Sequence, residues 1–142
     1  MCIRDRYNIT KGMIMDIGII IAGHGSFADG LKSSLEMVGG KNKSITSINF
    51  LASDNYKNLD KKFIEAYQSY KGKDYVIILV DLLGGTPFNR AYLSLSTKEN
   101  VRFIGNANFS LAYYLLNEEI DNIDTLIEES ISKACKNIVE YK

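Results

Sequence analysis

Two glycine-rich segments hold the residue types that could do chemistry. The only histidine of the chain, His24, lies in the string Ala-Gly-His-Gly-Ser directly after an apolar run at 16–22. Asp81 follows a second apolar run at 75–80 and opens the string Asp-Leu-Leu-Gly-Gly-Thr-Pro. A carboxylate that accepts a hydrogen bond from imidazole Nδ1 fixes the tautomer and leaves a lone pair on Nε2. It also stabilises the positive charge that develops when Nε2 bonds to phosphorus, so the pair is suited to carrying a phosphoryl group.

The second segment also offers a place for phosphoryl oxygens. A Gly84-Gly85-Thr86 turn before a helix exposes backbone N–H groups at the positive end of that helix, and the Thr86 hydroxyl adds a donor. The candidate phosphate-binding residues are Gly25, Leu83, Gly84, Gly85 and Thr86, and the candidate catalytic residues are His24, Asp81 and Thr86. Phosphoryl transfer needs mainly positioning and stabilisation of oxygen charge. The chain has no metal-ligand spacing, so we expect neither a metal nor a cofactor.

Each of these residues also has a purely structural interpretation. A lone histidine is often a surface or packing residue, and Asp81 could be only a turn former or a helix cap. Gly84-Gly85 could be only a tight connection between a strand and a helix. The position of His24 at a strand end, between glycines, favours the functional interpretation.

The elements that must position these segments alternate along the chain. Apolar and alternating runs predict strands at 16–22, 45–50, 75–80 and 100–104, and apolar residues at helical spacing predict helices at 27–38, 54–70, 87–96, 109–117 and 122–134. Such alternation predicts an α/β fold with an open, mainly parallel four-stranded sheet and helices on both faces. Parallel strands bring their carboxyl ends to one edge, so His24 and Asp81 meet if the first and third strands are neighbours.

Helix boundaries and faces follow from local signals. Thr86 is predicted as the N-cap of the helix that begins at Pro87, and Ser53 or Asp54 as the N-cap of the helix at 54–70. The apolar spacing places Tyr56 on the inward face of that helix, and Ile131 on the inward face of the helix at 122–134.

Composition narrows the function classes. The 142 residues include 17 basic and 17 acidic side chains, and this balance argues against a nucleic-acid partner. The two cysteines form no disulfide framework, and no apolar run approaches the roughly 20 residues that span a bilayer. We therefore expect a cytoplasmic protein. Residues 1–12 are expected to be a non-native or disordered leader, with Met13 or Met15 as the start of a single domain at 13–142.

At this point the two strings resemble a known family. The string Ile-Ala-Gly-His24-Gly-Ser-Phe-Ala-Asp-Gly-Leu resembles the phosphorylation-site segment of mannose/fructose/sorbose-type enzyme IIA proteins of the sugar phosphotransferase system. The string Asp81-Leu-Leu-Gly-Gly-Thr86-Pro-Phe-Asn resembles their second signature, and the resemblance spans roughly residues 13–142. The sequence differs from the usual family pattern after the fourth predicted strand, where many members carry Asn-Leu-Pro and this chain has Asn106-Ala-Asn-Phe109-Ser110.

The resemblance implies a relay. Such proteins take a phosphoryl group from the phosphohistidine of the carrier HPr and pass it to an enzyme IIB, which phosphorylates sugar entering through a membrane permease. His24 then matches the phosphorylated histidine with Nε2 as acceptor, Asp81 the paired carboxylate, and Thr86 a hydroxyl beside the ring. The family fold also implies a homodimer that exchanges an antiparallel C-terminal strand, which residues 136–141 would supply.

Other functions fit parts of the sequence. The phosphocarrier subunit of dihydroxyacetone kinases has a similar histidine segment, but the Gly-Gly-Thr-Pro-Phe-Asn string fits the sugar family better. A small tetrapyrrole chelatase or metal-binding module can open with Gly-His-Gly-Ser, although metal insertion would be expected to use a second histidine. A histidine phosphatase would surround its histidine with arginines, and only Arg90 and Arg102 lie outside the leader. A purely structural protein would leave the two glycine-rich strand ends unexplained.

Overall fold

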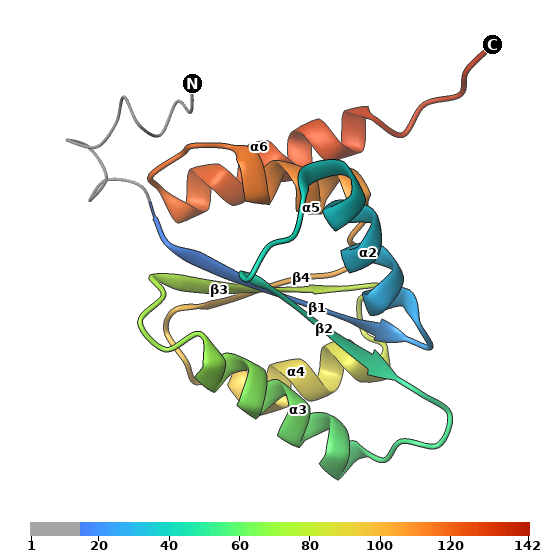
Figure 1. Ribbon diagram of the computed structural model, residues 1–142, viewed down its shortest axis with the longest axis vertical. Coiled ribbons are helices and arrows are strands. Elements are labelled where there is room, and N and C mark those ends of the chain that lie inside the picture. The colour runs from blue at the N-terminus through green and yellow to red at the C-terminus, as the bar shows by residue number, and fades with distance from the viewer. Residues whose placement is uncertain (1–14) are drawn as a thin grey trace.

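One parallel sheet lies between two layers of helices (Figure 1). The computed structural model describes residues 15–142, so the leader expected at 1–12 and the alternative start Met13 lie outside the described residues. The strands are β1 (Ile17–His24), β2 (Ile45–Phe50), β3 (Tyr75–Val80) and β4 (Val101–Ile104); the helices are α2 (Phe27–Gly39), α3 (Tyr56–Ser69), α4 (Thr86–Leu95), α5 (Phe109–Asn117) and α6 (Ile123–Lys136). The predicted α/β fold with a four-stranded sheet is confirmed.

The strand order places the two candidate segments side by side. The order is β2-β1-β3-β4 and every pairing is parallel. Ala22 of β1 is level with Val80 of β3, so Asp81 follows at the level of Gly23, one residue before His24. The carboxyl ends of β1 and β3 therefore meet at one edge of the sheet, as predicted.

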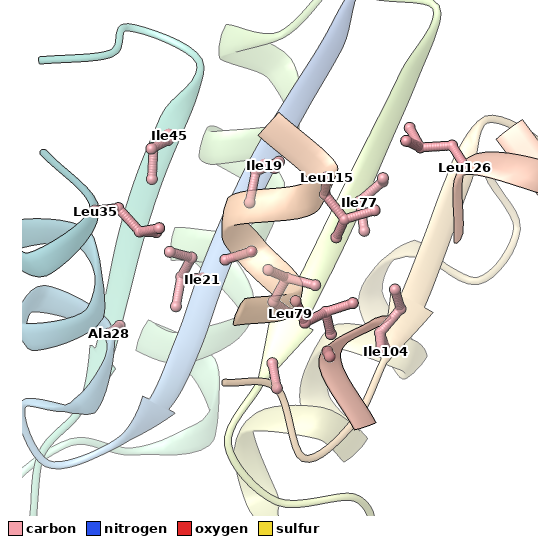
Figure 2. Close-up of a cluster of buried hydrophobic side chains, with 14 of the residues drawn as sticks. Ile19, Ile21, Ala28, Leu35, Ile45, Ile77, Leu79, Ile104, Leu115 and Leu126 are labelled. Carbon is pink, nitrogen blue, oxygen red and sulfur yellow. The ribbon is translucent and has the colours of Figure 1, made fainter. Parts of the chain in front are cut away.

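Alternating residues of the buried strands form two separate cores. Ile19 and Ile21 of β1, with Ile77 and Leu79 of β3, pack toward α2, α5 and α6 on one face of the sheet (Figure 2). The residues between them, such as Ile20 and Ile78, pack toward α3 and α4 on the other face. Because both faces are covered, the central strands are apolar at nearly every position. The register of β1 with β3 brings Asp81 to His24.

Two predicted N-caps are wrong. The N-cap of α4 is Gly85, and Thr86 is the first helical residue, so the threonine side chain does not cap the helix. The N-cap of α3 is Asn55, whose side chain accepts a hydrogen bond from the Asn58 N–H at 2.9 Å. Asp54 instead accepts from the Leu51 N–H in the preceding loop. In both cases the observed N-cap is one residue away from a predicted one. The geometry of the preceding loop decides which residue caps the helix, and the sequence pattern does not show it.

Two apolar side chains predicted to point inward are exposed. Tyr56, in the first turn of α3, is 54% exposed and its ring lies under the Arg90 guanidinium at 5.1 Å. Ile131 of α6 is 38% exposed, because Leu126, Ser130 and Ala134 form the buried stripe of that helix. The C-terminal segment after α6 has no strand pairing with any of residues 15–142, and α6 includes Lys136, so an exchanged strand stays a prediction for residues 137–141.

Candidate functional site

His24 is the last residue of β1, and its ring stands at the carboxyl edge of the sheet. Its side chain is 46% exposed. One edge of the ring contacts Phe50 at the end of β2, with 6.1 Å between ring centroids. The next residue, Gly25, turns the chain with a φ of +58° and donates its N–H to the Phe50 carbonyl at 2.8 Å. The strand thus fixes the backbone of His24, while the turn leaves the ring open on its outer side.

Asp81 holds the imidazole from the inner side. Its Oδ2 accepts a hydrogen bond from the His24 backbone N–H at 2.9 Å and lies 2.9 Å from His24 Nδ1. A carboxylate oxygen only accepts, so Nδ1 carries the hydrogen and Nε2 holds the lone pair. The side chain of Asp81 is only 16% exposed, and its Oδ1 is buried without a partner in residues 15–142.

Two glycines allow the close approach of these groups. A Cβ atom at Gly23 would lie 2.6 Å from the Phe27 ring and 3.0 Å from Asp81 Cγ. A Cβ atom at Gly85 would lie 2.9 Å from His24 Cε1, the ring atom between the two nitrogens. The N-terminus of α4 therefore lies directly against the imidazole, and any side chain at position 85 would displace the ring or the loop.

The N–H groups of the predicted phosphate-binding residues are not all available. Gly25 donates to Phe50, Leu83 donates to Asn106 Oδ1 at 3.2 Å, and Gly85 donates to the Leu82 carbonyl at 3.1 Å. Among the hydrogen bonds of residues 15–142, the N–H groups of Gly84 and Thr86 have no partner. These two remain as backbone donors at the positive end of α4, on either side of Gly85.

A second carboxylate lies near this edge without touching the histidine. Asp29, in the first turn of α2, accepts hydrogen bonds from Ser47 Oγ at 2.6 Å and from Asn49 Nδ2 at 2.8 Å. The hydrogen bond from Ser47, and to a lesser extent that from Asn49, holds the pKa of Asp29 below its ordinary value. These two bonds tie α2 to β2, so Asp29 has a structural role and no hydrogen bond to His24.

Sequence reasoning missed two asparagines that contact the loop at 81–85. Asn106 accepts from the Leu83 N–H, and Asn89 donates from Nδ2 to the Gly84 carbonyl at 3.0 Å. Asn106 was visible only as a departure from the usual sequence after the fourth strand. In the part of the chain that the structure describes, no three His, Cys, Asp or Glu side chains form a possible metal site, and no helix is long and apolar enough to cross a membrane.

Comparison with known proteins gives a consistent result. The model of the EIIA-man family, described as the fructose IIA component of the PTS system, matches residues 18–130. The fructose-specific EIIA component of Bacillus subtilis is 25% identical over 134 residues, which are 89% of this chain and 92% of that protein. The mannose-specific EIIAB component of Escherichia coli is 31% identical over 97 residues, which are 68% of this chain but only 30% of that longer protein. A crystal structure of EIIA from Streptococcus agalactiae superposes with a TM-score of 0.76 at 28% identity, covering 87% of this chain and 96% of that one.

Proposed function

Because the chain belongs to the EIIA-man family of phosphotransferase-system proteins, we propose that His24 is its phosphorylated residue. In this proposal Nε2 accepts a phosphoryl group from the phosphohistidine of HPr and later passes it to a separate enzyme IIB. The protein then acts in the cytoplasm as a phosphotransferase component for sugar uptake, and it meets the membrane permease only through enzyme IIB.

The observation that carries the proposal is the 2.9 Å contact between His24 Nδ1 and Asp81 Oδ2. In the transfer, the Nε2 lone pair forms a bond to phosphorus while the bond from phosphorus to the donor nitrogen breaks and its electrons stay with the donor. Nδ1 keeps its proton throughout and donates to Asp81. The nearby negative charge offsets the positive charge that the ring gains, and the reverse sequence releases the phosphoryl group to enzyme IIB.

Three donors are suited to the phosphoryl oxygens. The N–H groups of Gly84 and Thr86 lie where the N-terminus of α4 meets the ring, and the Thr86 side chain is half-buried at the same place. Since the Thr86 hydroxyl is not used as a helix cap, we propose that it donates to the phosphoryl group. These donors favour the charged oxygens through the same partial positive charge that binds anions at other helix N-termini.

The surroundings of His24 are suited to a protein partner. Leu82 and Leu83 are 51% and 58% exposed on the loop after β3, and Leu51 is 44% exposed on the loop after β2. Exposed leucines on loops beside a reactive ring give a partner apolar area to bury as its own histidine approaches. We propose that HPr and enzyme IIB use this surface in turn.

We also propose a homodimer in which residues 137–141 pair with the sheet of the other subunit. Ile138 and Val139 are each 74% exposed and Tyr141 is 98% exposed, which is unfavourable for a segment that stays in solvent. Within the described sheet β4 is an edge strand, so its outer side can accept another strand.

Incubation with HPr, its kinase and phosphoenolpyruvate tests the main proposal. We expect one acid-labile, base-stable phosphate per chain, located on His24, the only histidine. His24→Ala should abolish labelling without unfolding, since the side chain is nearly half exposed at the end of its strand. Label on another residue, or no label on a folded sample, refutes the proposal.

A further inference from the structure

The turn that follows β4 contains a strained residue next to the candidate site. Asn106 has a φ of +53°, in the left-handed region, and it is the only residue other than glycine with positive φ among residues 15–142. Asparagine tolerates this conformation better than most residues, but it still costs free energy relative to glycine. Such a conformation persists where surrounding contacts require it, so the contacts of Asn106 need an explanation.

Those contacts are with the loop that carries Asp81. Asn106 Oδ1 accepts a hydrogen bond from the Leu83 N–H at 3.2 Å. The residue before it, Gly105, lies so close to Leu83 that an added Cβ atom would be 2.7 Å from Leu83 Cβ. The residue after it, Ala107, donates its N–H to the Val80 carbonyl at 2.9 Å. The turn at 105–107 therefore holds the chain on both sides of Asp81.

Few other interactions fix this loop. Leu82 and Leu83 are both more than half exposed, so apolar burial contributes little to holding their backbone. The Gly85 N–H bonds to the Leu82 carbonyl within the loop, and Asn89 Nδ2 holds the Gly84 carbonyl at 3.0 Å from the side of α4. Asn106 thus holds the peptide group between Leu82 and Leu83, and Asn89 holds the peptide group between Gly84 and Gly85.

We propose that Asn106 is a positioning residue for the phosphoryl-transfer site. It does not touch His24. It fixes Leu83, two residues after Asp81, and through Leu83 it sets the path of the loop that places Gly84 and Gly85 beside the ring. It also occupies the Leu83 N–H, which leaves the Gly84 and Thr86 N–H groups as the backbone donors for the phosphoryl oxygens. The effect on transfer rests on the proposed function, whereas the effect on loop and ring geometry does not.

Three substitutions separate the hydrogen bond from the backbone strain. Asn106→Gly keeps the left-handed backbone and removes the acceptor, Asn106→Ala removes both, and Asn106→Asp keeps an acceptor oxygen and tolerates the same φ. The matched control is Asn108→Gly, because Asn108 lies in the same turn and its Oδ1 accepts from the Leu111 N–H at 2.9 Å as the N-cap of α5. That bond is of the same kind but does not reach the loop.

Two measurements on the unphosphorylated full-length protein test the geometry. We expect exchange of the Leu83 amide proton with water to rise several-fold or more in Asn106→Gly and Asn106→Ala, and to stay near wild type in Asn106→Asp and Asn108→Gly. The proton on His24 Nδ1, seen by NMR through its hydrogen bond to Asp81, should shift or broaden only in the first two variants. Unchanged Leu83 exchange and an unchanged Nδ1 proton in Asn106→Gly overturn the inference.

Phosphotransfer provides the third measurement. With phospho-HPr as donor, the transfer rate should fall about 10- to 100-fold in Asn106→Gly, because a displacement of about 1 Å in such a site has effects of that order. Asn106→Asp should recover most of the rate, and Asn108→Gly should lose none. A wild-type protein that takes no label defeats the proposed function but leaves the two geometric measurements as a test of Asn106. If the wild type is labelled but Asn106→Gly and Asn108→Gly transfer at equal rates, the inference about Asn106 is refuted and the proposed function stands.

Discussion

Replacing Asp81 by asparagine removes one charge and keeps the shape of the side chain. If the amide oxygen takes the place of Oδ2, it still accepts from the His24 backbone N–H and from Nδ1. The amide nitrogen then takes the place of Oδ1, which is buried and has no partner in residues 15–142. A buried donor without an acceptor costs about 1–3 kcal/mol, so Asp81→Asn should be less stable but folded.

The loss in transfer follows from the missing charge. Two unit charges 2.9 Å apart interact by about 1.4 kcal/mol in water and by about 6 kcal/mol at an effective dielectric constant of 20. The His24 side chain is 46% exposed and that of Asp81 16%, so solvent screening places the pair nearer the lower limit, at about 2 kcal/mol. At 1.36 kcal/mol for each factor of ten, the transfer rate should fall about 30-fold.

The assay is rapid-quench transfer from phospho-HPr, with stability followed by thermal unfolding. Asp29→Asn is the matched control, because it also removes a carboxylate charge near the carboxyl edge of the sheet. Asp29 bonds to Ser47 and Asn49 and makes no hydrogen bond to His24. That variant should lose stability but keep its transfer rate. Equal rates in wild type and Asp81→Asn would reduce Asp81 to a turn residue, and equal losses in the two variants would mean that only the net charge of the surface matters.

Three further predictions concern ring packing, pH and assembly. Gly85→Ala should slow transfer about tenfold or more because its Cβ would lie 2.9 Å from His24 Cε1, whereas Gly30→Ala, with open space around it in α2, should keep the rate and gain up to about 1 kcal/mol in unfolding free energy. Arg90 holds the pKa of Asp60 below its ordinary value of 3.8, so the stabilisation from this pair is complete above that pH and is lost as pH falls through the lower, folded-state pKa; Asp60→Asn should therefore lower Tm near neutral pH and converge with wild type in strong acid, and a constant difference in Tm would contradict this. Deletion of residues 138–142 should convert a dimer to a monomer in sedimentation at micromolar concentration, and a wild-type monomer would contradict the exchanged strand.

The order of elements was predictable because apolar or alternating runs alternate along the chain with apolar residues at helical spacing. Strand ends were less predictable. β1 continues two residues beyond the expected end, since Gly23 and His24 still pair with Asn49 and Phe50 of β2. A glycine and a histidine carry no strand signal of their own, so only the neighbouring strand determines that His24 belongs to β1.

Prediction of the site depended on how far apart its parts are in the sequence. The pairing of His24 with Asp81 could be predicted on the condition that the first and third strands are neighbours, because parallel strands bring their carboxyl ends to one edge. The observed strand order meets this condition. The contact between Asn106 and Leu83 joins two loops, and its geometry depends on a left-handed residue that no local pattern specifies. For the same reason the sequence could not show that the N–H groups of Gly25 and Gly85 are used within the protein.

The direction of Nε2 is fixed by the strand more than by the side-chain rotamer of His24. A single oxygen, Asp81 Oδ2, accepts from both the backbone N–H and Nδ1 of the same residue. The pairing of β1 with β2 extends to His24 and Phe50, and the pairing of β1 with β3 extends to Ala22 and Val80, so the backbone N–H of His24 is held in place. The oxygen bonded to this N–H cannot follow the ring, and the ring must keep its position to keep its own bond. Rotation of the imidazole would break the charge-assisted hydrogen bond between Nδ1 and Asp81. The exposed nitrogen is therefore held in one direction before a partner arrives, which reduces the entropy lost when the two histidines align for transfer.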